Sequence, residues 1–267
     1  MQDIFEAVIL GIIQGLTEFL PVSSSGHLEL GKFILGDDSL PEESLLMTVV
    51  VHFATSLATV VVFRKDIAEI LKNLIAEKGK GPDTTFVGYI IISMVPATFV
   101  GLFFEKEIEA LFNQNIVLVS CMLFVTGLLL LFTYRSTQSD GLLNGSRAFL
   151  IGISQAIAIL PGISRSGATI STALYLGVDK HSAARFSFLM VVPLILGKMA
   201  KDIMEGNITM QTMQLAPLVA GFTAAFITGY LSCSWMINVV KSSKLSYFAY
   251  YCFAIGTLGL IFTFLYA

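Results

Sequence analysis

The sequence predicts an all-α polytopic membrane protein with an inverted-topology repeat, each half holding one re-entrant helical hairpin and three transmembrane helices. Three observations predict this class. The 267 residues are 55% hydrophobic and only 13% charged, about half the charge of a typical soluble domain. Several apolar runs are long enough to cross a bilayer. Two other apolar regions are each broken in the middle, and they match each other. A soluble domain is therefore excluded, and the net charge of −3 offers no basic surface for nucleic acid.

The first half, residues 1–140 or thereabouts, begins with a broken apolar region at 4–36. The break reads Pro21-Val22-Ser23-Ser24-Ser25-Gly26, and proline, glycine and clustered serine all end helices. The segments on either side have roughly 10–16 residues, too few for an ordinary span. We therefore expect a re-entrant hairpin that enters and leaves the membrane on the same side. Three full spans follow, at about 44–63, 86–104 and 115–134.

The second half, about 141–267, repeats this order. Its broken region is 148–177, interrupted by Pro161-Gly162-Ile163-Ser164-Arg165-Ser166-Gly167. Three spans are predicted after it, at about 182–200, 214–235 and 246–266. We expect the two halves to form one integral membrane domain over residues 1–267.

The two hairpins align without a gap when the first is shifted by 141 positions. An odd number of crossings per half places the halves in opposite orientations, which defines an inverted-topology repeat. Shared apolar composition does not explain why glycine, glutamine and serine recur in register. The identities are Ala7/Ala148, Gly11/Gly152, Ile12/Ile153, Gln14/Gln155, Ser23/Ser164, Ser25/Ser166, Gly26/Gly167, Leu35/Leu176 and Gly36/Gly177.

The positive charges between spans predict the orientation. On the side that holds both termini, the basic residues are Lys32, Lys106, Lys198 and Lys201. The opposite side carries many more: Arg64, Lys65, Lys72, Lys78, Lys80, Arg135, Arg147, Lys180, Arg185, Lys241 and Lys244. By the positive-inside rule the second side is cytoplasmic. We expect both termini, and the opening of any site carried on the first hairpin, to face outward.

Polar residues lie where the membrane disfavours them, and such residues are usually functional. Gln14 and Glu18 share one face of a helix, and His27 follows the first break. The second break supplies Arg165. If the tips meet, one pocket holds a carboxylate, an imidazole, a guanidinium and several hydroxyls. The plainer alternatives are a structural Glu18–Arg165 ion pair and serines that only cap helices.

The repeat bears on these alternatives because the charged groups are not duplicated. Glu18 aligns with Ile159, Ser24 with Arg165, and His27 with Ala168. A purely structural network would have less reason to diverge at those positions. The other histidines, His52 and His181, lack such neighbours, and we expect them to be packing or interfacial residues.

The pattern favours an anionic ligand. The helices after each break should begin near Ser25-Gly26 and Ser166-Gly167, with free backbone N–H groups and positive dipole ends at the pocket. Arg165 adds a planar fork suited to phosphate. A phosphate site inside the membrane implies a phosphate carried on a lipid.

Two segments resemble the motifs of a known family. The run from Gln14 to His27 is similar to the (E/Q)xxxE segment and serine-rich turn of the bacterial undecaprenyl-diphosphate phosphatases, the UppP/BacA family. The run from Pro161 to Thr169 resembles that family's PGxSRSxxT motif. Both occur in the expected order, and the resemblance covers essentially the whole chain. The positions carried over are Glu18, Ser24, His27, Ser164, Arg165 and Thr169.

The resemblance implies a function, and a location in the bacterial inner membrane with the active site facing outward. The family removes the terminal phosphate of undecaprenyl diphosphate, which recycles the carrier lipid for peptidoglycan and confers bacitracin resistance. It also implies a divalent cation, Mg²⁺ or Ca²⁺, although the sequence contains no self-sufficient metal site and Glu18 is the one candidate ligand. The expected partners are the polyprenyl diphosphate substrate and membrane lipids, with no nucleic acid. A homodimer is left open.

The roles of individual residues stay partly open at this point. The expected catalytic residues are Glu18, Ser24, His27 and Arg165, with His27 as nucleophile or general acid/base and Ser24 or Ser164 as a second nucleophile candidate. The main alternative function is a lipid-phosphate flippase, because inverted repeats with broken helices are the architecture of secondary transporters. The expected substrate-binding residues are Gln14, Thr17, Ser23, Ser25, Gly26, Ser164, Ser166, Gly167 and Thr169.

Overall fold

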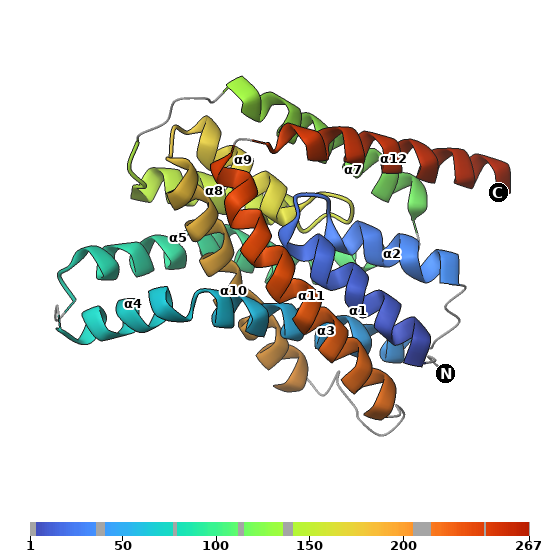
Figure 1. The fold of residues 1–267 in the computed structure, drawn as a ribbon, viewed down its shortest axis with the longest axis horizontal. Coiled ribbons are helices and arrows are strands. Elements are labelled where there is room, and N and C mark those ends of the chain that lie inside the picture. The colour runs from blue at the N-terminus through green and yellow to red at the C-terminus, as the bar shows by residue number, and fades with distance from the viewer. Residues whose placement is uncertain are drawn as a thin grey trace.

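A computed structural model describes most of the chain, and its backbone there is helical (Figure 1). Apart from turns, the described part contains one isolated β-bridge, between Gly141 and Val178. The all-helical prediction is confirmed. The described residues are 4–35, 41–76, 79–111, 115–135, 141–204, 215–242 and 244–266.

The first half begins with two helices separated by a short turn. α1 (Ile4–Phe19) and α2 (Ser24–Leu35) flank the predicted break at residues 20–23. The three predicted spans correspond to the next long helices: α3 (Pro41–Val62), α5 (Pro82–Phe103) and α7 (Ile116–Leu131).

The second half has the same order. α8 (Gly145–Ile157) and α9 (Arg165–Tyr175) flank the second break. The last three predicted spans correspond to α10 (Lys180–Met204), α11 (Leu215–Lys241) and α12 (Ser246–Tyr266).

Several of these helices can cross a bilayer. Within the described residues α5, α10, α11 and α12 are long and apolar enough, and α3 joins them when it is counted together with the helix that follows it. α7 is apolar but has only 16 residues, and the 3₁₀ turn η1 (Phe132–Arg135) follows it directly. The chain is thus a multi-pass membrane protein.

Two short helices stand where the sequence led us to expect loops. α4 (Arg64–Ala76) turns by 72° from the end of α3, and α6 (Glu105–Leu111) follows α5. α4 is amphipathic, and Ile70 is its one buried residue. The charged residues on its other face are not typical of a membrane-spanning helix. Its Asp66 accepts a 2.8 Å hydrogen bond from Arg185 of α10, which ties α4 to the bundle.

Glycines allow two pairs of helices to pack closely. At Gly11 of α1 an added Cβ would collide with the carbonyl oxygen of Gly221 on α11. At Gly152 of α8 it would collide with the backbone of Ser93 on α5. Each half's first hairpin helix therefore packs against a span of the other half.

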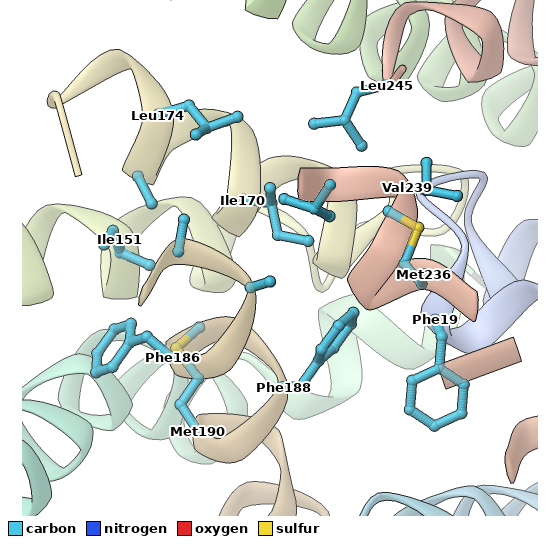
Figure 2. Packing of buried hydrophobic residues seen from close by; sticks show 14 of the residues in the cluster. Phe19, Ile151, Ile170, Leu174, Phe186, Phe188, Met190, Met236, Val239 and Leu245 are labelled. Atoms are coloured by element: carbon cyan, nitrogen blue, oxygen red, sulfur yellow. The ribbon is translucent and has the colours of Figure 1, made fainter. Parts of the chain in front are cut away.

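The main core lies behind the two hairpin tips. Figure 2 shows Phe188 of α10 beside Phe19, the last residue of α1, and their ring centroids are 5.8 Å apart. Met236 of α11 and Ile170 of α9 belong to the same cluster, and both are fully buried. Burial of these side chains holds the end of α1 against the second half, close to where α9 begins.

Candidate active site

The first tip is a tight turn capped by serine. Ser23 has a φ of 70°, a left-handed conformation that is uncommon for residues other than glycine. Its Oγ accepts a 3.2 Å hydrogen bond from the N–H of Gly26 and lies 3.4 Å from the Oγ of Ser25. α2 therefore begins at Ser24 inside the protein.

The second tip repeats the cap. The Oγ of Ser164 accepts a 3.1 Å hydrogen bond from the N–H of Gly167 and lies 3.3 Å from the Oγ of Ser166. The left-handed residue here is Gly162, with a φ of 96°. Thr126 of α7 supports the turn, since its hydroxyl donates to the Gly162 carbonyl and accepts from the Ser164 N–H, both at 3.0 Å.

The two tips are in direct contact. The hydroxyl of Ser166 donates a 3.2 Å hydrogen bond to the carbonyl of Leu20. A Cβ added to Gly26 would lie 3.2 Å from the Cα of Gly162, so only glycine fits there without displacing the opposite turn. The arrangement brings the N-termini of α2 and α9 together.

Glu18 is at the centre of the contact between the tips. Its Oε1 forms an ion pair with Nη2 of Arg165 from the other half. Its Oε2 accepts hydrogen bonds from the Ser24 hydroxyl at 2.6 Å and from Nε2 of Gln14 at 3.0 Å. The side chain of Glu18 is only 6% exposed. Four of the predicted site residues thus form one cluster around the buried Glu18.

Two polar atoms of this cluster have no hydrogen-bond partner. They are Nη1 of Arg165 and Oε1 of Gln14, and both are buried. A buried group without a partner is costly and needs an explanation. One donor on a guanidinium and one amide oxygen, both next to the Glu18 carboxylate, leave the cluster able to bind a further ligand.

The predicted threonines make hydrogen bonds within the protein. The Thr17 hydroxyl donates to the carbonyl of Ile13 at 2.6 Å. The Thr169 hydroxyl donates to the carbonyl of Arg165 at 2.8 Å and lies 2.6 Å from the Oγ of Ser187 on α10. Thr169 thereby braces the first turn of α9, which carries Arg165.

His27 lies on the side of α2 that faces α12. Its Nδ1 is 2.8 Å from the carbonyl oxygen of Ser23, and its Nε2 is 2.9 Å from the hydroxyl of Tyr251. Both ring nitrogens are therefore engaged with protein groups, and neither is hydrogen-bonded to Glu18.

The sequence reasoning missed His52, which we expected to be a packing or interfacial residue. The structure corrects this, because Nε2 of His52 lies 3.9 Å from Oε2 of Glu18. Nδ1 of His52 is 2.8 Å from the Thr48 carbonyl, which leaves Nε2 facing the carboxylate. The hydroxyl oxygen of Thr55, one turn further along α3, lies 3.5 Å from Nε2 of Gln14. Thr48, His52, Thr55 and Thr59 recur at helical spacing along α3, and this polar stripe could have identified the face that carries His52.

The cluster contains two oxygen groups that are candidate ligands for a divalent cation. The described residues contain no group of three His, Cys, Asp or Glu side chains placed to hold a metal ion. Glu18 and the unpartnered Oε1 of Gln14 do provide the oxygen ligands that Mg²⁺ and Ca²⁺ prefer. Further ligands would have to come from the oxygens of a bound phosphate.

Comparison with known proteins gives consistent matches over the whole chain. The family model described as bacitracin resistance protein BacA matches residues 7–258. An undecaprenyl-diphosphatase of Christiangramia forsetii is 60% identical over 98% of this chain and 99% of its own length. Undecaprenyl-diphosphatases of Bacteroides fragilis and Methanobrevibacter smithii are 46% and 37% identical, over 96% and 95% of the chain and 97% and 95% of their own lengths.

Proposed function

Because the chain belongs to the bacitracin resistance protein BacA family, we propose that the Glu18–Arg165 cluster is the active site of an undecaprenyl-diphosphatase. The protein hydrolyses undecaprenyl diphosphate to undecaprenyl phosphate and inorganic phosphate. This reaction recycles the carrier lipid for peptidoglycan synthesis and confers resistance to bacitracin. The observation that carries the site assignment is the Ser24 hydroxyl, 2.6 Å from a carboxylate that is paired with Arg165.

Ser24 is the nucleophile that this geometry supports best. A hydroxyl within hydrogen-bond reach of a base is the usual arrangement for nucleophilic catalysis. As the Ser24 oxygen attacks the terminal phosphorus, its proton moves to Oε2 of Glu18. The bond between that phosphorus and the bridging oxygen breaks, and undecaprenyl phosphate leaves with the bridging oxygen.

Water completes the reaction. Its oxygen attacks the phosphoserine phosphorus, its hydroxyl becomes part of inorganic phosphate, and its other proton returns to the Ser24 oxygen. The proton held by Glu18 is then released with the products. Ser164, the other serine considered, already accepts the cap hydrogen bond from Gly167, so its hydroxyl has the capping role of Ser23 rather than the position of Ser24 beside Glu18.

Arg165 and the two helix N-termini bind the diphosphate. The unpartnered Nη1 of Arg165 supplies a donor without breaking an existing bond, and the guanidinium neutralises charge that develops in the transition state. The first turns of α2 and α9 add backbone N–H groups and positive dipole ends. The predicted binding residues Ser23, Ser25, Gly26, Ser164, Ser166 and Gly167 shape these two N-termini.

A divalent cation belongs to this proposal. We propose that Glu18 and Oε1 of Gln14 would hold Mg²⁺ or Ca²⁺, which would supply positive charge beside the diphosphate.

A lipid-phosphate flippase is the second candidate, and the repeat supports it. α1 packs on α11 through Gly11, and α8 packs on α5 through Gly152, the position that aligns with Gly11. The serine caps also correspond, at Ser23 and Ser164. These paired contacts support the inverted-topology repeat, which would permit alternating access. We favour hydrolysis because the charged residues break the symmetry.

An assay on purified protein in detergent tests the function. We expect release of inorganic phosphate from undecaprenyl diphosphate, its loss with a chelator, and its return with Mg²⁺ or Ca²⁺. Ser24→Ala should lower kcat by 10³-fold or more, on the order of a lost nucleophile. Ser234→Ala is the control, because the Ser234 hydroxyl donates to the Tyr230 carbonyl of its own helix.

Two results would contradict parts of this proposal. Movement of lipid phosphate across sealed vesicles, with no phosphate release in detergent, would favour the flippase. Full activity of Ser24→Ala, or no phosphoserine at Ser24 in acid-quenched enzyme, would replace Ser24 by another nucleophile.

A further inference from the structure

Two consecutive residues of α12 contact the first hairpin, one at the start of α2 and one at the turn before it. The hydroxyl of Tyr251 is 2.9 Å from Nε2 of His27, and the two rings stack with centroids 5.6 Å apart and an interplanar angle of 11°. The Sγ of Cys252 lies 3.8 Å from the carbonyl oxygen of Pro21. α12 therefore braces the segment that precedes Ser24.

The hydrogen bonds fix the tautomer of the neutral His27 ring. The carbonyl oxygen of Ser23 can only accept, so Nδ1 of His27 carries a hydrogen and donates at 2.8 Å. In the neutral ring Nε2 then holds the lone pair. The Tyr251 hydroxyl donates to it, which forms a continuous chain from Tyr251 through His27 to the Ser23 carbonyl.

The end of this chain is the one residue with an unusual backbone. Ser23 is the described non-glycine residue with a positive φ, 70°, and such conformations persist when the surroundings hold them. The peptide that follows leads directly into Ser24, whose hydroxyl donates to Glu18. The conformation of Ser23 therefore decides where the Ser24 oxygen lies.

We propose that Tyr251 is a positioning residue for Ser24. It orients His27, and His27 holds the Ser23 carbonyl so that the Ser24 hydroxyl faces Glu18. His27 is then a positioning residue as well, and neither ring exchanges a proton with the substrate. This inference rests on the proposed function, with Ser24 as nucleophile.

The test compares two neighbouring tyrosines. Tyr251→Phe removes the hydroxyl and keeps the ring, and we expect kcat to fall roughly 10- to 100-fold, the scale of a misplaced reacting group, with KM changed less than twofold. Tyr250→Phe is the matched control, since Tyr250 is 62% exposed on the same turn of α12, and it should keep wild-type kcat. The melting temperature of both variants checks folding.

A double-mutant cycle separates positioning from a general structural effect. If Tyr251 acts through His27, adding Tyr251→Phe to His27→Gln should lower kcat no further. In single-turnover experiments the rate of phosphoserine formation should fall with Tyr251→Phe.

Each of the other outcomes contradicts either the role of Tyr251 or the proposed function. Wild-type kcat in Tyr251→Phe, a change in KM alone, or additive effects in the cycle would each overturn the role of Tyr251. If the wild-type enzyme releases no phosphate, the proposed function fails, and with it the basis of this inference.

Discussion

At the scale of the residue, the two terminal nitrogens of the Arg165 guanidinium have different roles. Nη2 pairs with Glu18, and Nη1 is buried without a partner. Arginine can serve both because its donors are fixed in a planar fork, whereas lysine offers one compact charge. The charge alone is therefore not sufficient for the role that we assign to this position.

Arg165→Lys should nearly abolish phosphate release while the protein still folds. Lysine keeps the positive charge beside Glu18 but cannot reach Glu18 and the phosphate at once. We expect a loss of about 2–4 kcal/mol of transition-state stabilisation, the scale for one such contact. The measurement is kcat/KM with undecaprenyl diphosphate, and Lys244→Arg between α11 and α12 is the control. Near-wild-type turnover would remove Arg165 from the phosphate site.

The sequence could predict the Gln14, Glu18, Ser24 and Arg165 cluster because helical spacing and the two matching breaks place these residues at facing tips. The polar stripe on α3 marks the face that carries His52, but it does not say which helix that face meets. His52 lies on a separate span, and its contact with Glu18 depends on packing between helices. The direction of His27 was likewise hidden, because its partner Tyr251 is near the end of the chain.

At the scale of the element, close helix contacts depend on the absence of a side chain. Gly152 of α8 touches the backbone of Ser93, and even a methyl group has no room there. Gly88 lies on the same α5 helix as Ser93, and a Cβ added there would have no neighbouring atom within 4 Å. We therefore expect the same substitution to have opposite effects on protein stability at these two glycines.

Gly152→Ala should destabilise the protein, while Gly88→Ala should be neutral or stabilising. Alanine at residue 152 must push α8 away from α5, and overpacking of this kind typically costs about 1–3 kcal/mol. At residue 88 the gain in helix propensity is about 0.5–1 kcal/mol. Thermal unfolding in one detergent measures both. Equal melting temperatures would mean that α8 and α5 do not need this close approach.

Spans were easier to predict than the helices between them. A long apolar run has few structures available in a membrane, so α5, α10, α11 and α12 could be recognised from hydrophobicity. α4 and α6 are charged and short, and such segments are compatible with a loop or a helix. Contacts that only the folded chain shows hold α4 in place: Ile70 is buried in the main core, and Asp66 pairs with Arg185.

At the scale of the whole molecule, the positions of the chain ends and of the loop charges predict the same orientation in the membrane. The start of α1 and the end of α12 lie on the same side of the fold in Figure 1. The basic residues concentrate away from that side, and the excess predicts that it faces outward. The predicted site would then be open to the face where the diphosphate carrier is released.

Cysteine labelling in intact cells tests this orientation. The native Cys121, Cys233 and Cys252 are first replaced, and single cysteines are placed at Ala110 of α6 and at Lys80, which are both exposed. We expect a membrane-impermeant thiol reagent to label the cysteine at 110 in intact cells. The cysteine at 80 should label only after permeabilisation, and the opposite pattern would mean that the termini face the cytoplasm.

The Glu18–Arg165 pair also bears on how each turnover ends. Glu18 stays paired with Nη2 of Arg165, so free inorganic phosphate can use only Nη1 of that guanidinium and lies beside a carboxylate that repels it. The lipid substrate offsets this repulsion with a second phosphate and a long apolar chain, whereas the free product has neither. The carboxylate thus weakens the binding of free phosphate, and we expect the enzyme to release that product readily even where the ion is abundant.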